Sequence, residues 1–254
     1  MTQAGNTDGF WIASRPAVYI NVATGKTKMY QVHPTVAYHY FNRLYPWAPN
    51  FRIIQAGPVN HAIVLQQKSC VVFELYRAKF ANNVLSAYSG AAWSLNHPFA
   101  PLADNTPSAM SSGLSLYGGL IRWEEIAAGH VDHALNWSAP VGTVSQWNYV
   151  KPASDTDQIP FAGTAFYQLP FGAHLRLRAS FNTSKFGPQS RAIAQAMKTY
   201  GIYLADTAGT NELYNSIALD GSNHWNAADL DQLEQIHISD FEVLKLGDVV
   251  TVPH

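Results

Sequence analysis

Two apolar runs, His61-Ala-Ile-Val-Leu-Gln66 and Cys70-Val-Val-Phe-Glu-Leu-Tyr76, establish the β character of this chain. Both are rich in the β-branched and aromatic residues that strands favour. The link between them, Gln67-Lys68-Ser69, is short enough for a hairpin. The sequence therefore predicts two antiparallel strands near residues 61–76.

Further strands are expected on both sides of this hairpin. Residues 17–22 and 175–181 alternate between an apolar and a polar face, which is the period of a half-buried strand. Residues 36–50, 96–119 and 147–172 are expected to be irregular, and the second of these to be a long surface loop. Other expected strands lie near residues 10–13, 28–32, 84–95, 131–137, 202–206 and 241–246.

Two helices are expected in the last third of the chain. Pro188 suits the first turn of a helix that runs to Tyr200, and Gly201 suits the left-handed stop after it. Asn226 is the expected N-cap of a second helix over residues 227–235.

The fold class that follows is all-β, a β-sandwich or jelly roll with two short helices near the C-terminus. We expect one domain over residues 1–254, with the helices near 188–200 and 227–235.

Composition excludes several classes of protein. Charged residues make up 13% of the 254 residues and the formal net charge is −1, whereas a nucleic-acid-binding protein needs a concentrated basic surface. The hydrophobic content of 47% argues against disorder. No apolar run approaches the ~20 residues of a membrane span. We therefore expect neither a nucleic acid nor a membrane as partner.

Cysteine content and the start of the chain bear on the cellular compartment. Cys70 is the single cysteine, so no disulfide framework forms within one chain. Residues 1–8 are polar and lack the basic and apolar parts of a signal peptide. With 7 Trp and 13 Tyr beside many uncharged polar residues, the composition favours a secreted protein whose signal peptide has been removed.

A likeness to a known family runs over roughly residues 60–245. The runs that carry it are 73–76, 119–126, 133–135, 175–181, 186–193, 197–206 and 229–236. They resemble an uncharacterised family of secreted, β-rich bacterial proteins from soil and environmental genomes. The secreted character of that family and its association with biomass degraders imply chemistry on polysaccharides.

Carboxylates are the first candidates for catalytic residues, because glycoside hydrolysis needs two of them ~5–9.5 Å apart. Glu74 lies within an otherwise apolar strand, where a raised pKa suits a general acid. Glu124 and Glu125 are adjacent and point in different directions, so one of them could enter a cleft. Glu125 is the expected partner of Glu74. Asp157, in a long loop with Asp155, is expected to contact substrate. The alternatives are solvated carboxylates and an ordinary Asx turn.

The only compact histidine cluster is His130-Val-Asp-His133. A strand would place its two histidines on opposite faces, so a metal site would need His61, His97 or His224 from elsewhere. We expect no metal and no other cofactor. His133 is instead a candidate catalytic or substrate-positioning residue; its alternative is a buried core histidine.

Trp123 and Trp225 are expected to bind substrate, because indole rings stack on the C–H faces of sugars. Arg176 and Arg178 share one face of a strand and could neutralise a sugar carboxylate; their alternative is an exposed basic stripe. No G-x-S-x-G, P-loop, G-x-G-x-x-G or H-E-x-x-H motif is present.

The sequence thus favours a glycoside hydrolase that acts on a polysaccharide or oligosaccharide through paired carboxylates. A polysaccharide lyase that uses His133 or a tyrosine with an arginine neutraliser is one alternative. A non-catalytic glycan-binding module is the other.

Overall fold

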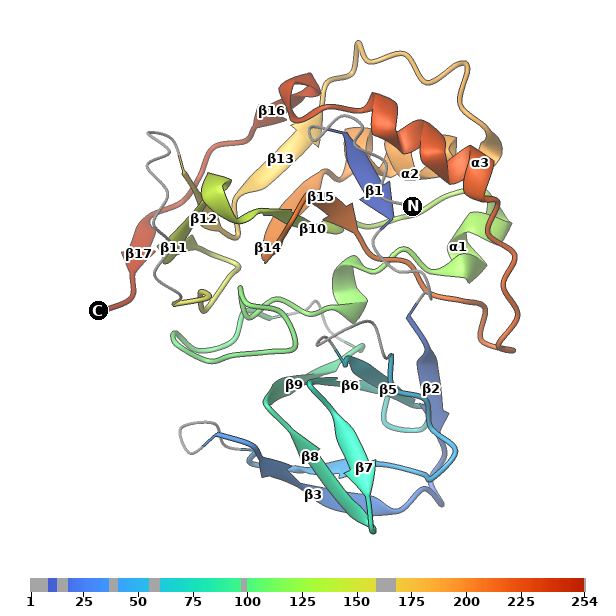
Figure 1. The fold of residues 1–254 in the computed structure, drawn as a ribbon, viewed down its shortest axis with the longest axis vertical. Helices are drawn as coiled ribbons and strands as arrows, with labels where there is room; N and C mark the ends of the chain where they lie inside the picture. The colour runs from blue at the N-terminus through green and yellow to red at the C-terminus, as the bar shows by residue number, and fades with distance from the viewer. Residues whose placement is uncertain are drawn as a thin grey trace.

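The computed structural model describes residues 9–12, 18–36, 41–54, 60–96, 100–158 and 168–253. Within them the chain folds into two β-rich bodies that stack one on the other (Figure 1). The first body holds strands β2 to β9. The second holds β1, the later strands and the three α-helices of the described residues.

The first body is a small β-sandwich. Its strands are β2 (Ile20–Ala23), β3 (Met29–Pro34), β4 (Leu44–Pro46), β5 (Ala62–Gln66), β6 (Val71–Tyr76), β7 (Lys79–Ala81), β8 (Val84–Ala87) and β9 (Ser89–Ser94). They form two four-stranded sheets, β2-β5-β6-β9 and β4-β3-β8-β7. Val64 and Phe73 of the first sheet pack against Val32, Tyr45 and Leu85 of the second.

The predicted hairpin is confirmed, because β5 and β6 pair antiparallel from Ala62↔Leu75 to Gln66↔Val71. One loop prediction for this body was wrong. Strand β4 lies within residues 36–50, where Tyr45 pairs with Tyr30 of β3. This pairing depends on a neighbouring strand, so the local sequence does not reveal it.

The second body is built on a mixed sheet of six strands in the order β1-β15-β10-β14-β13-β16. Their bounds are β1 (Phe10–Ile12), β10 (Leu135–Pro140), β13 (His174–Leu177), β14 (Ile202–Ala208), β15 (Asn211–Leu213) and β16 (Phe241–Val243). A three-stranded sheet lies beside it, made of β11 (Val144–Val150), β12 (Leu169–Phe171) and β17 (Val249–Thr251).

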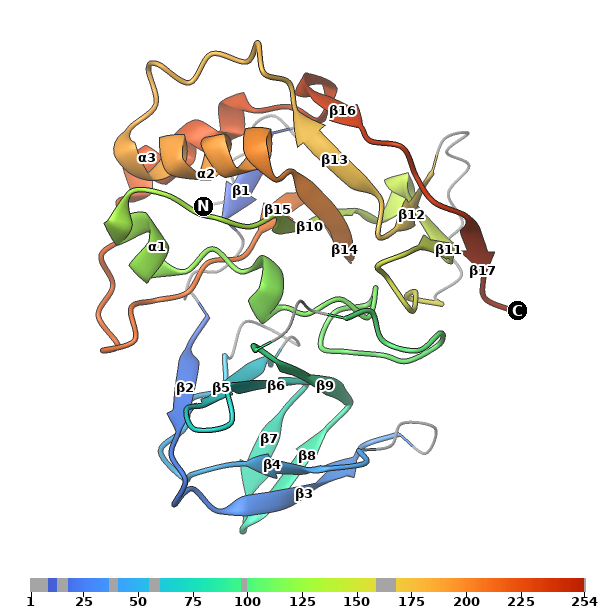
Figure 2. The ribbon, with the colours of Figure 1, turned by 180° about the vertical axis from the view of Figure 1, so that it is seen from behind.

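Helices α2 and α3 lie on the side of the six-stranded sheet that faces away from the first body, and α1 lies nearer to that body (Figure 2). The α-helices are α1 (Trp123–Ala128), α2 (Pro188–Thr199) and α3 (Ala227–Leu230), with short 3₁₀ turns η1 (Tyr117–Gly119), η2 (Val141–Thr143), η3 (Asp231–Gln235) and η4 (Ile238–Asp240). Met197 of α2 and Leu233 of η3 share a core with Trp137 and Leu204 of the sheet.

The two expected helices form with the expected ends. Pro188 opens α2, and Gly201 takes a φ of 79° just after its end. Asn226 caps α3 by accepting a hydrogen bond from the backbone N–H of Asp229, but the α-helix covers only 227–230 and continues as a 3₁₀ turn. Within the described residues the strands form four sheets and the helices are short, so the predicted all-β class is confirmed.

Helix α1 was not expected, and the strand predicted over residues 131–137 begins only at Leu135. The signals for α1 are local. The Glu125 side chain accepts a hydrogen bond from the backbone N–H of Arg122, and Gly129 ends the helix with a φ of 87°.

The expected surface loop over residues 96–119 is mostly exposed over residues 100–105, but buried or half-buried over residues 106–119. Met110 and Leu116 are 2% and 0% exposed and pack with Ile63 and Val72 of the first body and Ala205 of the second. This segment therefore forms part of the contact between the two bodies.

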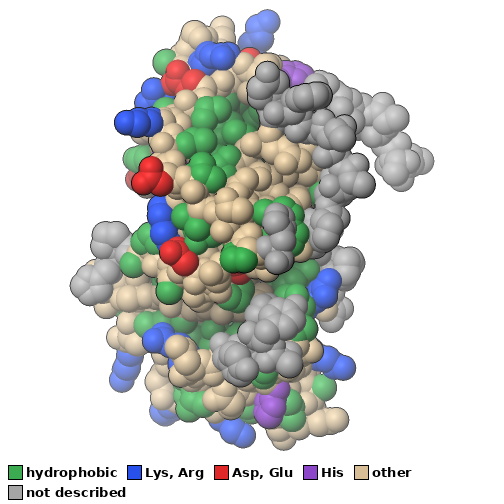
Figure 3. Space-filling view, turned by 90° about the vertical axis from the view of Figure 1, so that its left-hand side faces the viewer, with side chains coloured by type: hydrophobic (Ala, Val, Ile, Leu, Met, Phe, Trp, Pro, Cys, Tyr) green, Lys and Arg blue, Asp and Glu red, His purple; other side chains and the backbone are tan. Residues whose placement is uncertain are grey.

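On the face seen in Figure 3, charged side chains are scattered rather than gathered into one basic area. This agrees with the low content of charged residues. Within the described residues, every helix is too short or too polar to cross a lipid bilayer.

Candidate functional site

A cleft with a volume of about 650 Å³ lies where the two bodies meet. This is within the size range of ligand pockets in proteins. The cleft is lined by residues 76–77, 88–89, 107–111, 155–158, 206–207 and 214. It therefore draws on both bodies and on the segment between them.

Asp206 reaches the cleft because of an irregularity in strand β14. Trp137 of β10 pairs with Leu204, but Ser138 pairs with Asp206, so Ala205 is an extra residue. Successive residues of β10 point to opposite faces, so the bulge turns Asp206 away from the core that Trp137 and Leu204 share. Such bulges are common beside active sites, where they redirect a side chain.

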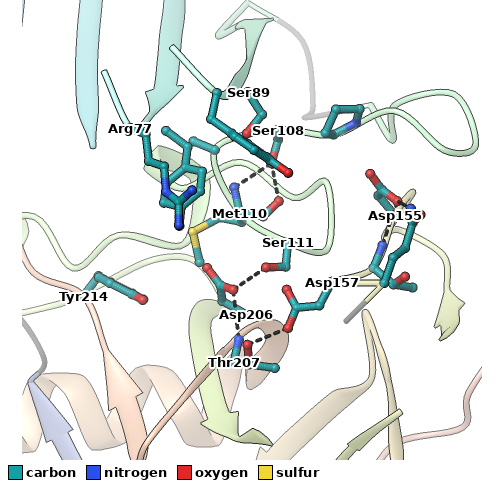
Figure 4. Close-up of a pocket in the computed structure, with 16 residues that line it drawn as sticks. Arg77, Ser89, Ser108, Met110, Ser111, Asp155, Asp157, Asp206, Thr207 and Tyr214 are labelled. Carbon is teal, nitrogen blue, oxygen red and sulfur yellow. Dashed lines mark hydrogen bonds between the residues drawn. The ribbon is translucent and has the colours of Figure 1, made fainter. Parts of the chain in front are cut away.

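A second carboxylate, that of Asp157, lies beside Asp206. The Ser111 hydroxyl donates to Oδ1 of Asp206 at 2.5 Å, and the backbone N–H of Thr207 donates to the same oxygen at 2.9 Å. The Thr207 hydroxyl donates to Oδ2 of Asp157 at 2.5 Å. One threonine therefore connects the two carboxylates (Figure 4).

The pKa of Asp206 is raised to about 7, chiefly because the carboxyl is buried and also because of the negative charge of Asp157. Hydrogen bonds from Ser111 and Thr207 act in the opposite direction without cancelling this effect. Asp206 therefore holds a proton up to nearly neutral pH, as a general acid must.

The walls of the cleft combine tyrosine rings with one cation. Arg77 lies 5.2 Å from the ring centroid of Tyr76 and 5.4 Å from that of Tyr88. On the other side, the Tyr214 hydroxyl accepts a hydrogen bond from Ser138 at 3.1 Å. Asp155, which also lines the cleft, accepts hydrogen bonds from the residues that follow it and shapes the local turn.

Of the residues selected from the sequence, Asp157 is the one that lines this cleft. Glu74 lies elsewhere and is 0% exposed. Its carboxylate accepts hydrogen bonds from the hydroxyl of Ser115 at 2.6 Å and from the backbone N–H groups of Leu116 and Tyr117 at 2.8 and 2.9 Å. Burial outweighs these bonds and raises the pKa of Glu74 to about 7.

Glu125 and His133 meet each other rather than Glu74. Nε2 of His133 lies 3.2 Å from Glu125, and Nδ1 lies 2.8 Å from the carbonyl oxygen of Ala134. Glu125 also forms an ion pair with Arg122, and these partners lower its pKa against the opposing effect of burial. The group is half-buried beside α1, and none of its members lines the cleft.

The two selected tryptophans also meet each other. Trp123 and Trp225 are in edge-to-face contact with ring centroids 5.3 Å apart, and both pack partly against the core. The Trp225 indole N–H donates to the carbonyl of Ser216 at 2.7 Å. Neither ring lines the cleft.

Arg176 and Arg178 lie exposed on and just after β13, as a basic stripe would. Arg176 binds the carboxylate of Glu242 at 2.7 and 2.9 Å, and Arg178 donates to the carbonyl of Ser239 at 2.5 Å. Neither reaches the cleft.

No group of three or more His, Cys, Asp and Glu side chains that could hold a metal ion is found in the described part of the chain. His61 is 3% exposed, and burial lowers its pKa to about 4. His224 lies on the surface beside Ser222. His97 lies outside the described residues.

Sequence reasoning missed Asp206 although it predicted the strand that carries it. The signal was an acidic residue at the end of the strand predicted over residues 202–206. Strict alternation would place Asp206 on the same face as Ile202 and Leu204, that is, in the core. Only the bulge shows that it faces the cleft.

Comparisons of the chain with models of protein families, with curated proteins and with solved structures found no match. The resemblance to a family of secreted bacterial proteins therefore stays a prediction.

Proposed function

We propose that the protein is a glycoside hydrolase whose active site is the cleft between the two bodies. Asp206 would be the general acid, and Asp157 its carboxylate partner. The observation that supports this most directly is the pKa of about 7 at Asp206, beside a second carboxylate. Two carboxyl groups in different protonation states are what glycoside hydrolysis requires.

In the proposed reaction, Asp206 gives its proton to the oxygen of the glycosidic bond as the bond to the sugar breaks. Asp157 then either takes a proton from an attacking water or bonds to the sugar itself before water releases it. In both cases one water is consumed, and the proton count returns to its starting value.

The walls of the cleft suit a sugar chain. Tyr76, Tyr88 and Tyr214 offer ring faces together with hydroxyl groups. Among the described residues that line the cleft, Arg77 is the one cation, against three aspartates. This charge balance favours a neutral glycan over the uronic-acid chains on which lyases act, so hydrolysis is preferred to elimination.

The test is to replace each carboxyl by an amide and to measure reducing ends released from a panel of neutral polysaccharides. We expect Asp206→Asn and Asp157→Asn each to lower the rate by about 10²–10⁴-fold, the usual contribution of acid–base catalysis. Asp132→Asn, an exposed position outside the cleft, is the matched control and should keep the full rate. Full activity in both cleft variants would exclude this assignment.

The pH dependence gives a second readout of the same proposal. The rate should fall as pH rises through about 7, because Asp206 loses the proton that it must donate. If the wild-type protein and the Asp206→Asn variant both bind these polysaccharides but neither releases reducing ends, the protein is a glycan-binding module instead.

A further inference from the structure

A second groove, with a volume of about 360 Å³, adjoins the cleft. Ser89 and Pro107 line both cavities, so the two lie next to each other. Strand β9 runs from one into the other, with Ser89 in the cleft and Gly90, Ala91 and Ala92 in the groove. These small side chains leave space beside the strand.

The lining of this second groove differs from that of the cleft. Among the described residues, three aspartates line the cleft, whereas the single charged residue that lines the groove is Arg43. Asn42 and Asn105 add amide groups that both donate and accept hydrogen bonds, and Phe41 adds an aromatic ring. This combination suits a neutral sugar with many hydroxyl groups, and the described residues that line the groove include no carboxylate that could act in catalysis.

We infer that the second groove binds further sugar units of a linear chain whose scissile bond lies in the acidic cleft. The inference rests on the proposed function and narrows its substrate class to linear oligosaccharides and polysaccharides, with Asn105 as a residue that determines chain-length preference. Binding energy gained in the groove would add to that gained in the cleft only for chains long enough to reach both.

The role of the Asn105 side chain can be tested without disturbing the backbone. Its backbone has a φ of 58°, which glycine adopts without strain, so Asn105→Gly removes the amide while the turn is kept. Asn83 offers a matched control, because it has a φ of 59° in the exposed turn between β7 and β8 and lines neither cavity. A general effect of Asn→Gly on stability would appear in both variants.

The experiment measures affinity by titration calorimetry for cello-, xylo- and manno-oligosaccharides, from disaccharide to hexasaccharide, with the Asp206→Asn protein so that no chain is cut. We expect the affinity for at least one series to rise about tenfold or more with length. Adding Asn105→Gly should weaken binding of the longest chains about fivefold to tenfold, as the loss of one hydrogen bond does, and leave the shortest unchanged. Adding Asn83→Gly should change neither.

Equal affinity for all lengths, or an equal loss for short and long chains, would overturn the inference. If the wild-type protein nevertheless hydrolyses one of these series, the proposed hydrolytic function is supported, and only sugar binding in the second groove is excluded. If no chain is hydrolysed but long chains bind better through Asn105, sugar binding in the second groove is supported and the proposed hydrolytic function is wrong. If no chain binds, both are wrong.

Discussion

The carboxylate of Glu74 joins strand β6 to the segment that leads into α1. It receives three hydrogen bonds from Ser115, Leu116 and Tyr117, and all of them are buried or partly buried. We expect Glu74→Ala to lower the free energy of unfolding by about 3 kcal/mol or more, because two backbone N–H groups and a hydroxyl lose their acceptor inside the protein. Glu74→Gln should cost less, since one acceptor oxygen remains.

Urea unfolding at constant pH measures this effect, and Glu242→Ala is its control. Glu242 forms an exposed ion pair with Arg176, and such pairs contribute about 0–1 kcal/mol. If Glu74→Ala cost no more than Glu242→Ala, the three hydrogen bonds would not stabilise the contact between the bodies.

Glu74 and Asp206 show how far single residues could be predicted. An acidic residue within an apolar strand already indicates a buried carboxyl, and Glu74 is buried. Its partners, however, lie more than forty positions away, and no local pattern announces them. The direction of Asp206 depends on one extra residue in β14, which the alternation of the sequence does not encode.

Helix α2 begins without a side-chain cap of its own, because its N-cap is Gly187. Asp229 of α3 takes that role. It accepts from the backbone N–H groups of Gln189 and Ser190 at 2.9 and 3.1 Å and from the Ser190 hydroxyl at 2.5 Å. A Cβ on residue 187 would lie 2.5 Å from the Asp229 carboxyl carbon, which explains the glycine.

Asp229→Ala should therefore lower stability by about 2–4 kcal/mol, because it removes both a cap and a negative charge at the helix N-terminus. Asn226→Ala removes only the cap of the short helix α3 and should cost about 1 kcal/mol. Thermal unfolding followed by circular dichroism compares the two. A smaller loss for Asp229→Ala than for Asn226→Ala would contradict this account.

Elements were predictable where their signals are local. Pro188 and Gly201 mark the two ends of α2, and Asn226 marks the start of α3. Strand β4 depends on pairing with β3, and the burial of residues 108–116 depends on both bodies at once. The cap that Asp229 supplies to α2 is equally non-local, so the sequence showed the helix but not what holds its first turn.

The contact between the two bodies contains two carboxyl groups that keep their protons on folding. The pKa values of Glu74 and Asp206 are both raised to about 7, whereas in the unfolded chain both groups lose their protons near pH ~4. Between the pKa values of the unfolded and the folded state, these two groups bind more protons in the folded protein than in the unfolded chain. The free energy of unfolding therefore falls as pH rises through this range. His61, with a pKa lowered to about 4, acts in the opposite direction below pH ~6.5.

The effect of the two carboxyl groups on the free energy of unfolding exceeds the opposite effect of the single imidazole. We therefore expect the stability of the wild-type protein to fall between pH ~5 and pH ~7 and to change little above that range. Asp206→Asn removes one of the two titrating groups, so its stability should decline less over the same interval. Asp132→Asn, at an exposed site, should follow the wild type. Urea midpoints measured across this range at constant ionic strength decide the matter. A stability that rises with pH would mean that these carboxyls are charged in the folded protein, and Asp206 would then have no proton to donate in the cleft.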